Sequence, residues 1–283
     1  MLRTRKPVLG ASGVSTRFTI AVLFVIAAGF SALAHAETRS VEGFDIDTVV
    51  LRGSDELKIE WSDANRLLVK GDQKDLDRQP FYVRGKTLYL GYTEGRKRVK
   101  GVKYLLEANS LKEIELEGSG AIWVEPLETD ELHLKVAGSG DIRAHDVKAT
   151  HLELSVAGSG SIELARAESE IMEVEMAGSG DIALGKVDTI RLDIDMSGSG
   201  DIYSEGTGSA EDLEIGLAGS GDIDVHTIRA TKADIGIAGS GDVYVWVEDD
   251  LEVGIIGSGD VHYHGDPNVD SSVMGSGEVT PAD

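Results

Sequence analysis

The chain has 283 residues, of which 50 are acidic and 27 basic, with a formal net charge of −23 and no cysteine. Such an acidic chain is poorly suited to nucleic acid or anionic membrane surfaces as main partners, and favours solubility, cations and basic surfaces. Without cysteine it cannot rely on disulfides or on an acylated N-terminal cysteine.

The first 36 residues have the pattern of an export signal. Four basic residues precede or border an apolar run from Phe18 to Phe30, and the segment ends at Ala34-His35-Ala36. The run is short for a bilayer span and its small-x-small ending suits a signal peptidase, so we expect cleavage after Ala36; an uncleaved membrane anchor is the alternative. Cleavage leaves 23 basic and 50 acidic residues, a net charge of −27. No later stretch is apolar enough for a membrane-spanning helix, which predicts a periplasmic or secreted protein.

Residues 37–117 alternate like β-strands but show no regular repeat. We expect strands over the ranges Phe44–Leu51, Leu57–Trp61, Leu67–Val69, Phe81–Val83 and Thr87–Tyr92. We interpret this region as the irregular first coils and the cap of the repeat that follows. The basic run from Gly95 to Gly101 is interpreted as a solvated loop, with a docking patch for the acidic body as the alternative.

Residues 118–283 contain a regular repeat. Gly-Ser-Gly begins at Gly118, Gly138, Gly158, Gly178, Gly198, Gly219, Gly239, Gly257 and Gly275. Five of the eight intervals are 20 residues, one is 21 and two are 18, which is typical of a solenoid with one structural unit per repeat. Between the turns, apolar and polar residues alternate as in strands. We therefore predict an all-β, single-stranded parallel β-helix with about 20 residues per coil, forming one continuous domain over residues 37–283.

Equivalent positions of the repeats are apolar and should stack in the interior. One column follows the turns: Ile122, Ile142, Ile162, Ile182, Ile202, Ile223, Val243, Val261 and Val279. A second comprises Leu134, Leu154, Val174, Ile194, Ile215, Ile235 and Val253. Each coil must bend sharply at its corners, where glycine alone reaches positive φ without a Cβ clash. We expect Ile142, Ile162 and Ile182 to lie in one interior file.

These motifs resemble a known family. The repeated GSGDI after an alternating strand, the opening Gly43-Phe-Asp-Ile, the segment Gly85-Lys-Thr-Leu and the ending Gly265-Asp-Pro with Val273-Met-Gly-Ser-Gly are similar to the DUF2807 family, described as the "putative autotransporter adhesin head", or GIN, domain. The resemblance covers about Val41 to Val279. It implies a right-handed β-helix at or outside the cell envelope, with no established activity.

Acidic residues directly after the turns should form a ladder along one edge. They are Asp141, Asp181, Asp201, Asp222, Asp242 and Asp260, with Ser161 interrupting and Glu278 at the end. Asp181, Asp201, Asp222, Asp242 and Asp260 are candidate calcium ligands, because GSGD is similar to a calcium-binding nonapeptide. That nonapeptide needs a glycine turn every nine residues, whereas this chain has one per coil. We therefore favour turn capping by the aspartate side chains and expect no resident metal or cofactor.

A second exposed column is also acidic. It comprises His133, Glu153, Glu173, Asp193, Glu214, Asp234 and Glu252, with Glu175 and Asp195 beside it. We interpret this acidic face as a means of solubility and of blocked edge pairing in an exported all-β protein, with steering of a partner as the alternative.

The C-terminal coils carry the most varied side chains. Strand alternation and stacking predict one outward column of Asp224, Tyr244 and His262, and a neighbouring column of His226, Trp246 and His264. Aromatic and imidazole groups together suit a sugar ring or a transition metal. Polar shielding of the last rungs is the simpler interpretation.

No residues form a convincing catalytic set. Lyases and hydrolases built on β-helices need a cleft of convergent acids and bases, whereas the paired carboxylates Asp193 and Asp195 belong to a repeating face. The turn serines are not followed by a helix, as a nucleophile elbow requires. We predict a non-enzymatic structural and binding protein, an acidic rod that displays a surface to the envelope, a glycan or a basic protein. Self-association through the end coils is expected from their open strand edges. A carbohydrate-active enzyme and a calcium-dependent adhesive module are the alternatives.

Overall fold

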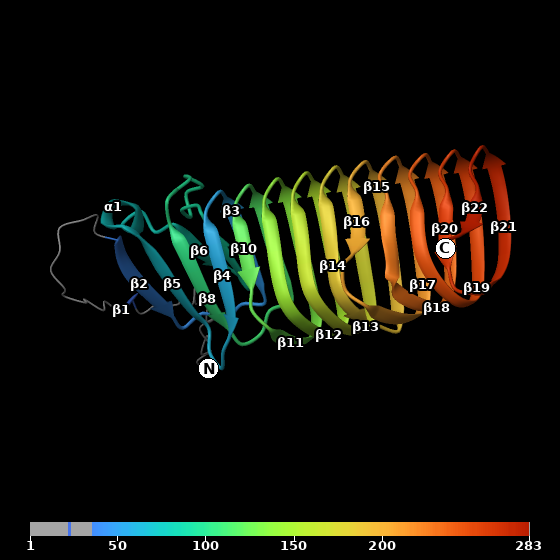
Figure 1. Cartoon of the computed structure of the whole chain (residues 1–283). Coiled ribbons are helices and arrows are strands. Elements are labelled where there is room, and N and C mark those ends of the chain that lie inside the picture. The colour runs from blue at the N-terminus through green and yellow to red at the C-terminus, as the bar shows by residue number, and fades with distance from the viewer. Residues whose placement is uncertain (1–21, 24–35, 283) are drawn as a thin grey trace, which may run out of the picture.

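The computed structural model describes residues 22–23 and 36–282, so the expected export signal, residues 1–36, lies almost entirely outside the described residues. The chain forms a β-solenoid of about 8 turns with roughly 20 residues per turn. Figure 1 shows the coils stacked side by side along a rod, from the N-terminal strands to β21. The predicted all-β solenoid is therefore confirmed, and its right-handedness stays a prediction.

The N-terminal elements include short strands and one helical turn. They are β1 (Val22–Leu23), β2 (Ala36–Glu42), β3 (Thr48–Gly53), β4 (Glu56–Trp61), β5 (Arg66–Asp72), α1 (Gln73–Leu76), β6 (Phe81–Arg84), β7 (Thr87–Leu90), β8 (Lys103–Ala108) and β9 (Glu113–Gly118). Strands β3 and β4 pair in parallel with β9 and β10 and so belong to the first coil. Strand β5 pairs antiparallel with both β2 and β8, and α1 packs beside it. This antiparallel layer is the cap, and the sequence pattern did not predict its helix.

The regular coils consist of strands that pair in parallel with the next coil. They are β10 (Ala121–Val124), β11 (Leu127–Gly138), β12 (Asp141–Gly158), β13 (Ser161–Gly178), β14 (Asp181–Asp188), β15 (Arg191–Gly198), β16 (Asp201–Ser204), β17 (Gly208–Gly219), β18 (Ile223–Gly239), β19 (Val243–Gly257), β20 (Val261–His264), β21 (Asn268–Gly275) and β22 (Val279–Pro281). Within β12 the alternation of buried and outward residues breaks at residues 145–146 and 150–151. The chain bends at these two places and at the glycine corner, which gives each coil three segments.

The glycine corners stack directly on one another. The first glycine of each Gly-Ser-Gly has a φ between 130° and 153°. A Cβ on Gly178 would lie 2.1 Å from the carbonyl oxygen of Gly158, so any other residue would suffer both an unfavourable φ and a clash. The stack begins one coil before the first Gly-Ser-Gly: Gly53, with a φ of 112°, pairs with Gly118, and its carbonyl accepts a hydrogen bond from the Ser119 N–H at 2.7 Å.

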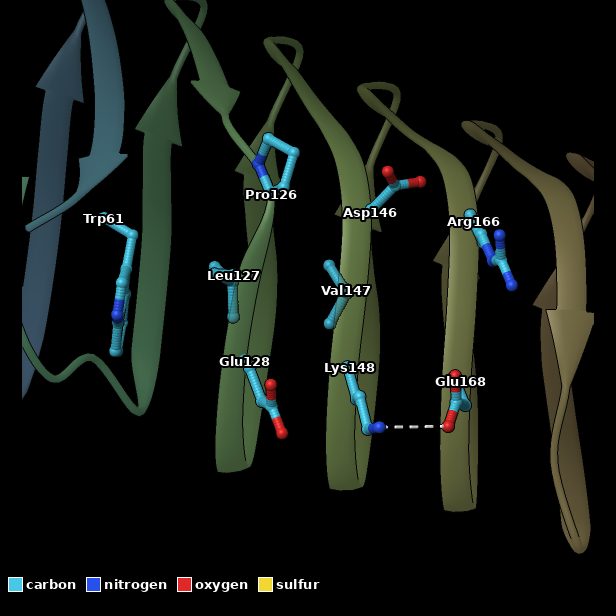
Figure 2. A pocket seen from close by; sticks show the side chains of 9 residues that line it. All are labelled: Trp61, Pro126, Leu127, Glu128, Asp146, Val147, Lys148, Arg166 and Glu168. Carbon is cyan, nitrogen blue, oxygen red and sulfur yellow. Dashed lines mark ion pairs between the residues drawn. The ribbon is translucent and has the colours of Figure 1, made fainter.

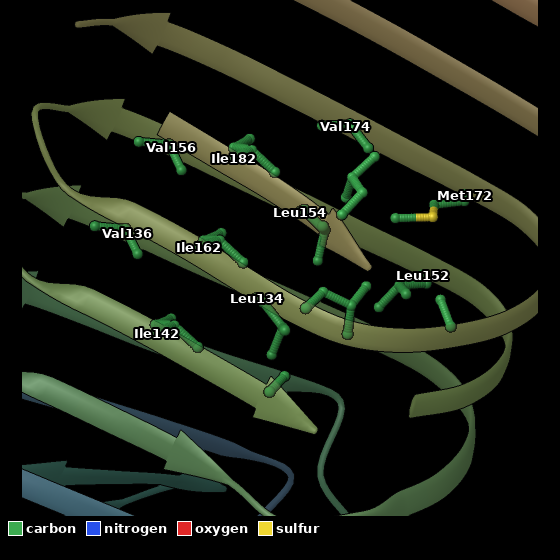
Figure 3. Packing of buried hydrophobic residues seen from close by; sticks show 14 of the residues in the cluster. Leu134, Val136, Ile142, Leu152, Leu154, Val156, Ile162, Met172, Val174 and Ile182 are labelled. Carbon is green, nitrogen blue, oxygen red and sulfur yellow. The ribbon is translucent and has the colours of Figure 1, made fainter. Parts of the chain in front are cut away.

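The interior is filled by the predicted apolar columns. Ile142 pairs with Ile162 and Ile162 with Ile182, and each has an exposed fraction of 0%. The second column is also in register from Leu134 to Val253, and all its members are buried. Figure 3 shows these side chains lying above one another between the strands. The stack of identical rungs therefore produces both the core and the regular outward columns.

Candidate functional site

Four of the six aspartates that follow the corners cap the next coil, and Asp181 is not among them. One carboxylate oxygen, Oδ1, of Asp201, Asp222, Asp242 and Asp260 accepts a hydrogen bond from the backbone N–H at the equivalent position one coil on, at 3.2, 2.9, 2.9 and 2.8 Å respectively. Asp141 Oδ1 accepts a hydrogen bond from the Ser161 hydroxyl at 2.9 Å. These contacts give the ladder a structural role that needs no cation. Within residues 22–23 and 36–282, no group of three or more His, Cys, Asp or Glu residues is placed to hold a metal ion.

The acidic face is in register over the rod. The column His133, Glu153, Glu173, Asp193, Glu214, Asp234 and Glu252 pairs residue by residue and continues to Asp270. Its middle part is partly neutralised, because the Arg191 guanidinium lies 2.9 Å from the Asp193 carboxylate and 2.8 Å from that of Glu214. Asp234, Glu252 and Asp270 have no ion-pair partner in the described part of the chain. Within this column, the last three carboxylates are thus the ones left without an ion pair in the described residues.

The charge of the chain is divided unevenly along the rod. Residues 37–117 contain 15 basic and 16 acidic residues, a net charge of −1. Residues 118–283 contain 8 basic and 34 acidic residues, a net charge of −26. The regular coils of residues 118–283 therefore carry the acidic surface, and residues 37–117 are nearly neutral.

The first predicted C-terminal column is confirmed. Asp224 pairs with Tyr244 and Tyr244 with His262, and the tyrosine and imidazole rings stack with their centroids 4.7 Å apart. Partial burial, followed by the charge of Asp242, raises the pKa of Tyr244. The Thr280 hydroxyl lies 3.0 Å from Nδ1 of His262 and closes the column on the last coil.

The second predicted column is wrong in one member. Trp246 pairs with Arg229, and not with His226, because two register shifts interrupt the pairing of β18 with β19. At the first shift, β18 has three more residues between Asp224 and Arg229 than β19 has between their partners Tyr244 and Trp246. At the second shift, after Ala230, β18 has one residue fewer than β19. The net difference of two residues matches the shorter interval of 18 between Gly239 and Gly257. The bulge still leaves the His226 ring 5.6 Å from the His264 ring and in contact with Asp224.

The aromatic groups of these coils stack on each other rather than facing solvent. The Arg229 guanidinium lies 4.8 Å from the Trp246 ring centroid on the side of the preceding coil. The His264 ring stacks at 5.5 Å on the side of the following coil. Both faces of the indole are therefore covered, so this ladder is better suited to holding the last coils together than to stacking on a sugar.

A cleft beside Trp61 was not predicted. Trp61 is 42% exposed and stands at the end of a cleft of about 480 Å³ on the first regular coils, shown in Figure 2. Leu127 and Val147 form part of its floor, and the Lys148 ammonium lies 3.2 Å from the Glu168 carboxylate at its rim. Trp61 alternates in β4 with the buried residues Leu57 and Ile59. The structure exposes it because β4 ends at this residue.

None of the helices in residues 22–23 and 36–282 is long and apolar enough to cross a bilayer.

Comparison with known proteins identifies relatives of the whole rod. The family model described as "Putative auto-transporter adhesin, head GIN domain" matches residues 45–168 and 165–267. A solved "putative lipid binding protein" from Parabacteroides distasonis ATCC 8503 is 26% identical, with a TM-score of 0.64, covering 88% of this chain and 97% of its own. A "putative adhesin" from Parabacteroides merdae ATCC 43184 is 20% identical, with a TM-score of 0.67 and coverages of 88% and 96%. The latter likeness concerns the fold alone. No curated protein matches the chain.

Proposed function

Since the chain belongs to the DUF2807 family of adhesin head domains, we propose that it is a non-catalytic, adhesin-like binding protein of the cell envelope. The observation that carries this proposal is the acidic face, a flat column of carboxylates in register from coil to coil. The protein would act by presenting these carboxylates to a partner, because a rigid stack holds the side chains at a fixed spacing of about 4.8 Å. The partner we propose is a basic protein surface.

The position of the unpaired carboxylates supports a basic partner. Asp234, Glu252 and Asp270 belong to adjacent coils, and the nearest column on their face contains Gly236 and Gly254, which have no side chain to obstruct an approaching surface. Binding of this kind is electrostatic and exposed, so it should weaken as salt screens the charges.

A lipid-binding role is less well supported, although one relative is described as lipid binding. An acyl chain needs an apolar cavity. The interior of the rod is filled by its own core columns, and the Trp61 cleft has a rim of charged residues. The adhesin-like family and the export signal expected in residues 1–36 support the proposed localisation at the envelope or outside the cell.

The test uses the mature chain, residues 37–283, and an immobilised lysine homopolymer as the probe of a basic surface. The variant Asp234→Asn/Glu252→Gln/Asp270→Asn removes three charges from the acidic face. The control Glu248→Gln/Asp249→Asn/Asp266→Asn removes three exposed charges outside this column. We expect the first variant to bind on the order of tenfold more weakly at 0.15 M salt, and the control to bind nearly as wild type. Equal losses in both would show that net charge alone, and not this face, attracts the probe.

A further inference from the structure

One outward column of the rod has a single gap. After the glycine corners, the outward positions pair in the order Trp123, Arg143, Glu163, Ala183, Tyr203, Asp224, Tyr244 and His262. All of these side chains except that of Ala183 extend beyond Cβ. Coils lie about 4.8 Å apart, so the backbones of the two coils that flank Ala183 are roughly 9.6 Å apart. Because the side chain of Ala183 is only a methyl group, the side chains of Glu163 and Tyr203 leave a slot between them that is wide enough for one ring.

The gap widens into a cleft at the neighbouring bend of the coils. The adjoining outward residues Ala165 and Gly185 are also small, and together with Ala183 they form the floor of a cleft of about 560 Å³. A Cβ on Gly185 would lie 2.0 Å from the carbonyl oxygen of Ala165, so this glycine is required by the fold. Ala183 has no such constraint. The volume lies within the usual range for small-molecule sites.

One wall of the cleft is an aromatic ring with a free side. Tyr203 is half-buried and lines the cleft at its C-terminal side. In the described part of the chain no ring or guanidinium stacks on it, in contrast to Trp246, whose two faces are covered by Arg229 and His264. Burial, followed by the charge of Glu205, raises the pKa of the Tyr203 hydroxyl, which therefore stays protonated and can donate a hydrogen bond.

The opposite wall is a fixed pair of charged groups. The Arg143 guanidinium donates two hydrogen bonds to the Glu163 carboxylate, from Nε at 3.0 Å and from Nη2 at 3.1 Å. Such a bidentate pair holds its remaining donors and acceptors in a defined orientation. The charges of Arg143 and Glu163 cancel, so of the charged residues that line the cleft only Glu205 is left without an opposite charge among the described ion pairs. His145 and Glu205 add further hydrogen-bonding groups at the rim.

These features select a ligand class. A flat aromatic wall favours an apolar ring face, and the Arg143–Glu163 pair with the Tyr203 hydroxyl favours a ligand rich in hydroxyl groups. The Glu205 carboxylate disfavours an anionic ligand, and Arg143, already paired with Glu163, is not free to offset it. We propose that this cleft binds a neutral carbohydrate, with one pyranose ring inserted over Ala183 against the ring of Tyr203. This specificity goes beyond the proposed binding of basic surfaces and uses a different face of the rod.

The test is binding of the mature chain to an array of neutral oligosaccharides, followed by affinity measurement for the best member. Tyr203→Ala removes the stacking wall, and Ala183→Gln fills the slot without changing charge. We expect each to weaken binding at least tenfold, while Tyr203→Phe retains most of it. Tyr244→Ala, which removes a half-buried tyrosine of the same column outside the cleft, should bind as wild type. Thermal unfolding of each variant shows whether the fold is kept.

Two outcomes would overturn the carbohydrate proposal: no neutral oligosaccharide binds the wild type, or Ala183→Gln binds as tightly as the wild type. The acidic-face variant separates the two proposals. It should bind the oligosaccharide normally, and oligosaccharide binding should persist at 0.5 M salt, where binding to the lysine homopolymer is lost. Failure of one proposal therefore leaves the other measurable.

Discussion

The two ends of the rod are built differently. At the N-terminal end, β2 and β5 form an antiparallel layer, and Leu76 of α1 is fully buried beneath it. At the C-terminal end, β21 pairs with β19 on one side only, and all eight of its residues are exposed. Val269 and Val273 continue the core columns but are 40% and 39% exposed. The N-terminal end is closed and the C-terminal end is open.

This contrast shows where the stability of a solenoid lies. A coil gains burial and backbone hydrogen bonds from the coil on each side, so a coil with one neighbour gains about half of both. The last rung is adapted to this exposure, because the core column that contains Val253 ends in Ser271. Substitutions at the two ends should therefore have unequal effects.

The largest expected difference concerns the corner glycines. Gly118→Ala places a Cβ 2.4 Å from the carbonyl oxygen of Gly53 inside the stack, and we expect a loss of about 3 kcal/mol or more in the free energy of unfolding. Gly275→Ala meets Gly257 at 1.8 Å, but the last coil is free to move away, so only the strain of the positive φ remains and we expect about 1–2 kcal/mol. Urea unfolding monitored by circular dichroism measures both. Equal losses would contradict an open end.

Core truncation should show the same order with smaller values. Leu76→Ala empties a buried site under the cap and should cost about 2–4 kcal/mol. Val269→Ala, at the open end, should cost less than about 1 kcal/mol because the side chain is already partly in water. The same unfolding measurement applies. A larger loss for Val269→Ala would mean that another element covers the last coil.

Self-association of the open end stays a prediction. Strand β21 exposes unpaired backbone groups together with Val273 and Met274, the latter 68% exposed, which suits pairing with the same edge of a second copy. We expect concentration-dependent dimers in sedimentation velocity, and a dissociation constant at least tenfold higher for Val273→Lys. Monomers alone at all concentrations would count against it.

The regular coils were predictable because their information is repeated. Each apolar column, the acidic face and the corner stack appear several times in the sequence, so register could be assigned by aligning repeats. Gly53 was missed because its corner reads Gly-Ser-Asp. The pairing of Trp246 was wrong because the interval of 18 residues does not say where the two residues are lost. The slot at Ala183 could not be predicted because a single alanine is informative only once the larger side chains that stack on both sides of it are known.

The smallest expected effect is a pH dependence of the free energy of unfolding that is caused by Asp55, near the closed end. Asp55 is 5% exposed; its Oδ1 accepts hydrogen bonds from the N–H groups of Gly101 and Val102 at 2.8 and 3.2 Å, while Oδ2 has no hydrogen-bond partner. Burial raises the pKa of this carboxyl in the folded state. Its protonated form therefore contributes stability that is present below the unfolded pKa of about 3.9 and is lost as pH rises through the folded pKa.

Asn at this position resembles the protonated acid at every pH. We expect Asp55→Asn to unfold with a free energy up to about 1 kcal/mol higher than wild type at pH 7. The difference should shrink as pH falls towards 4. Guanidinium unfolding at several pH values measures it, and a difference that stays constant with pH would show that burial does not shift this group.

Hydrogen exchange along the whole chain, read by mass spectrometry, tests the account most directly. Opening free energies should be high from the cap strands β2 and β5 through the coils up to β19, and should fall sharply over β20, β21 and β22. Uniform protection to the last coil, or earlier exchange at the cap than at β21, would contradict a rod that is closed at its N-terminal end and open at the other.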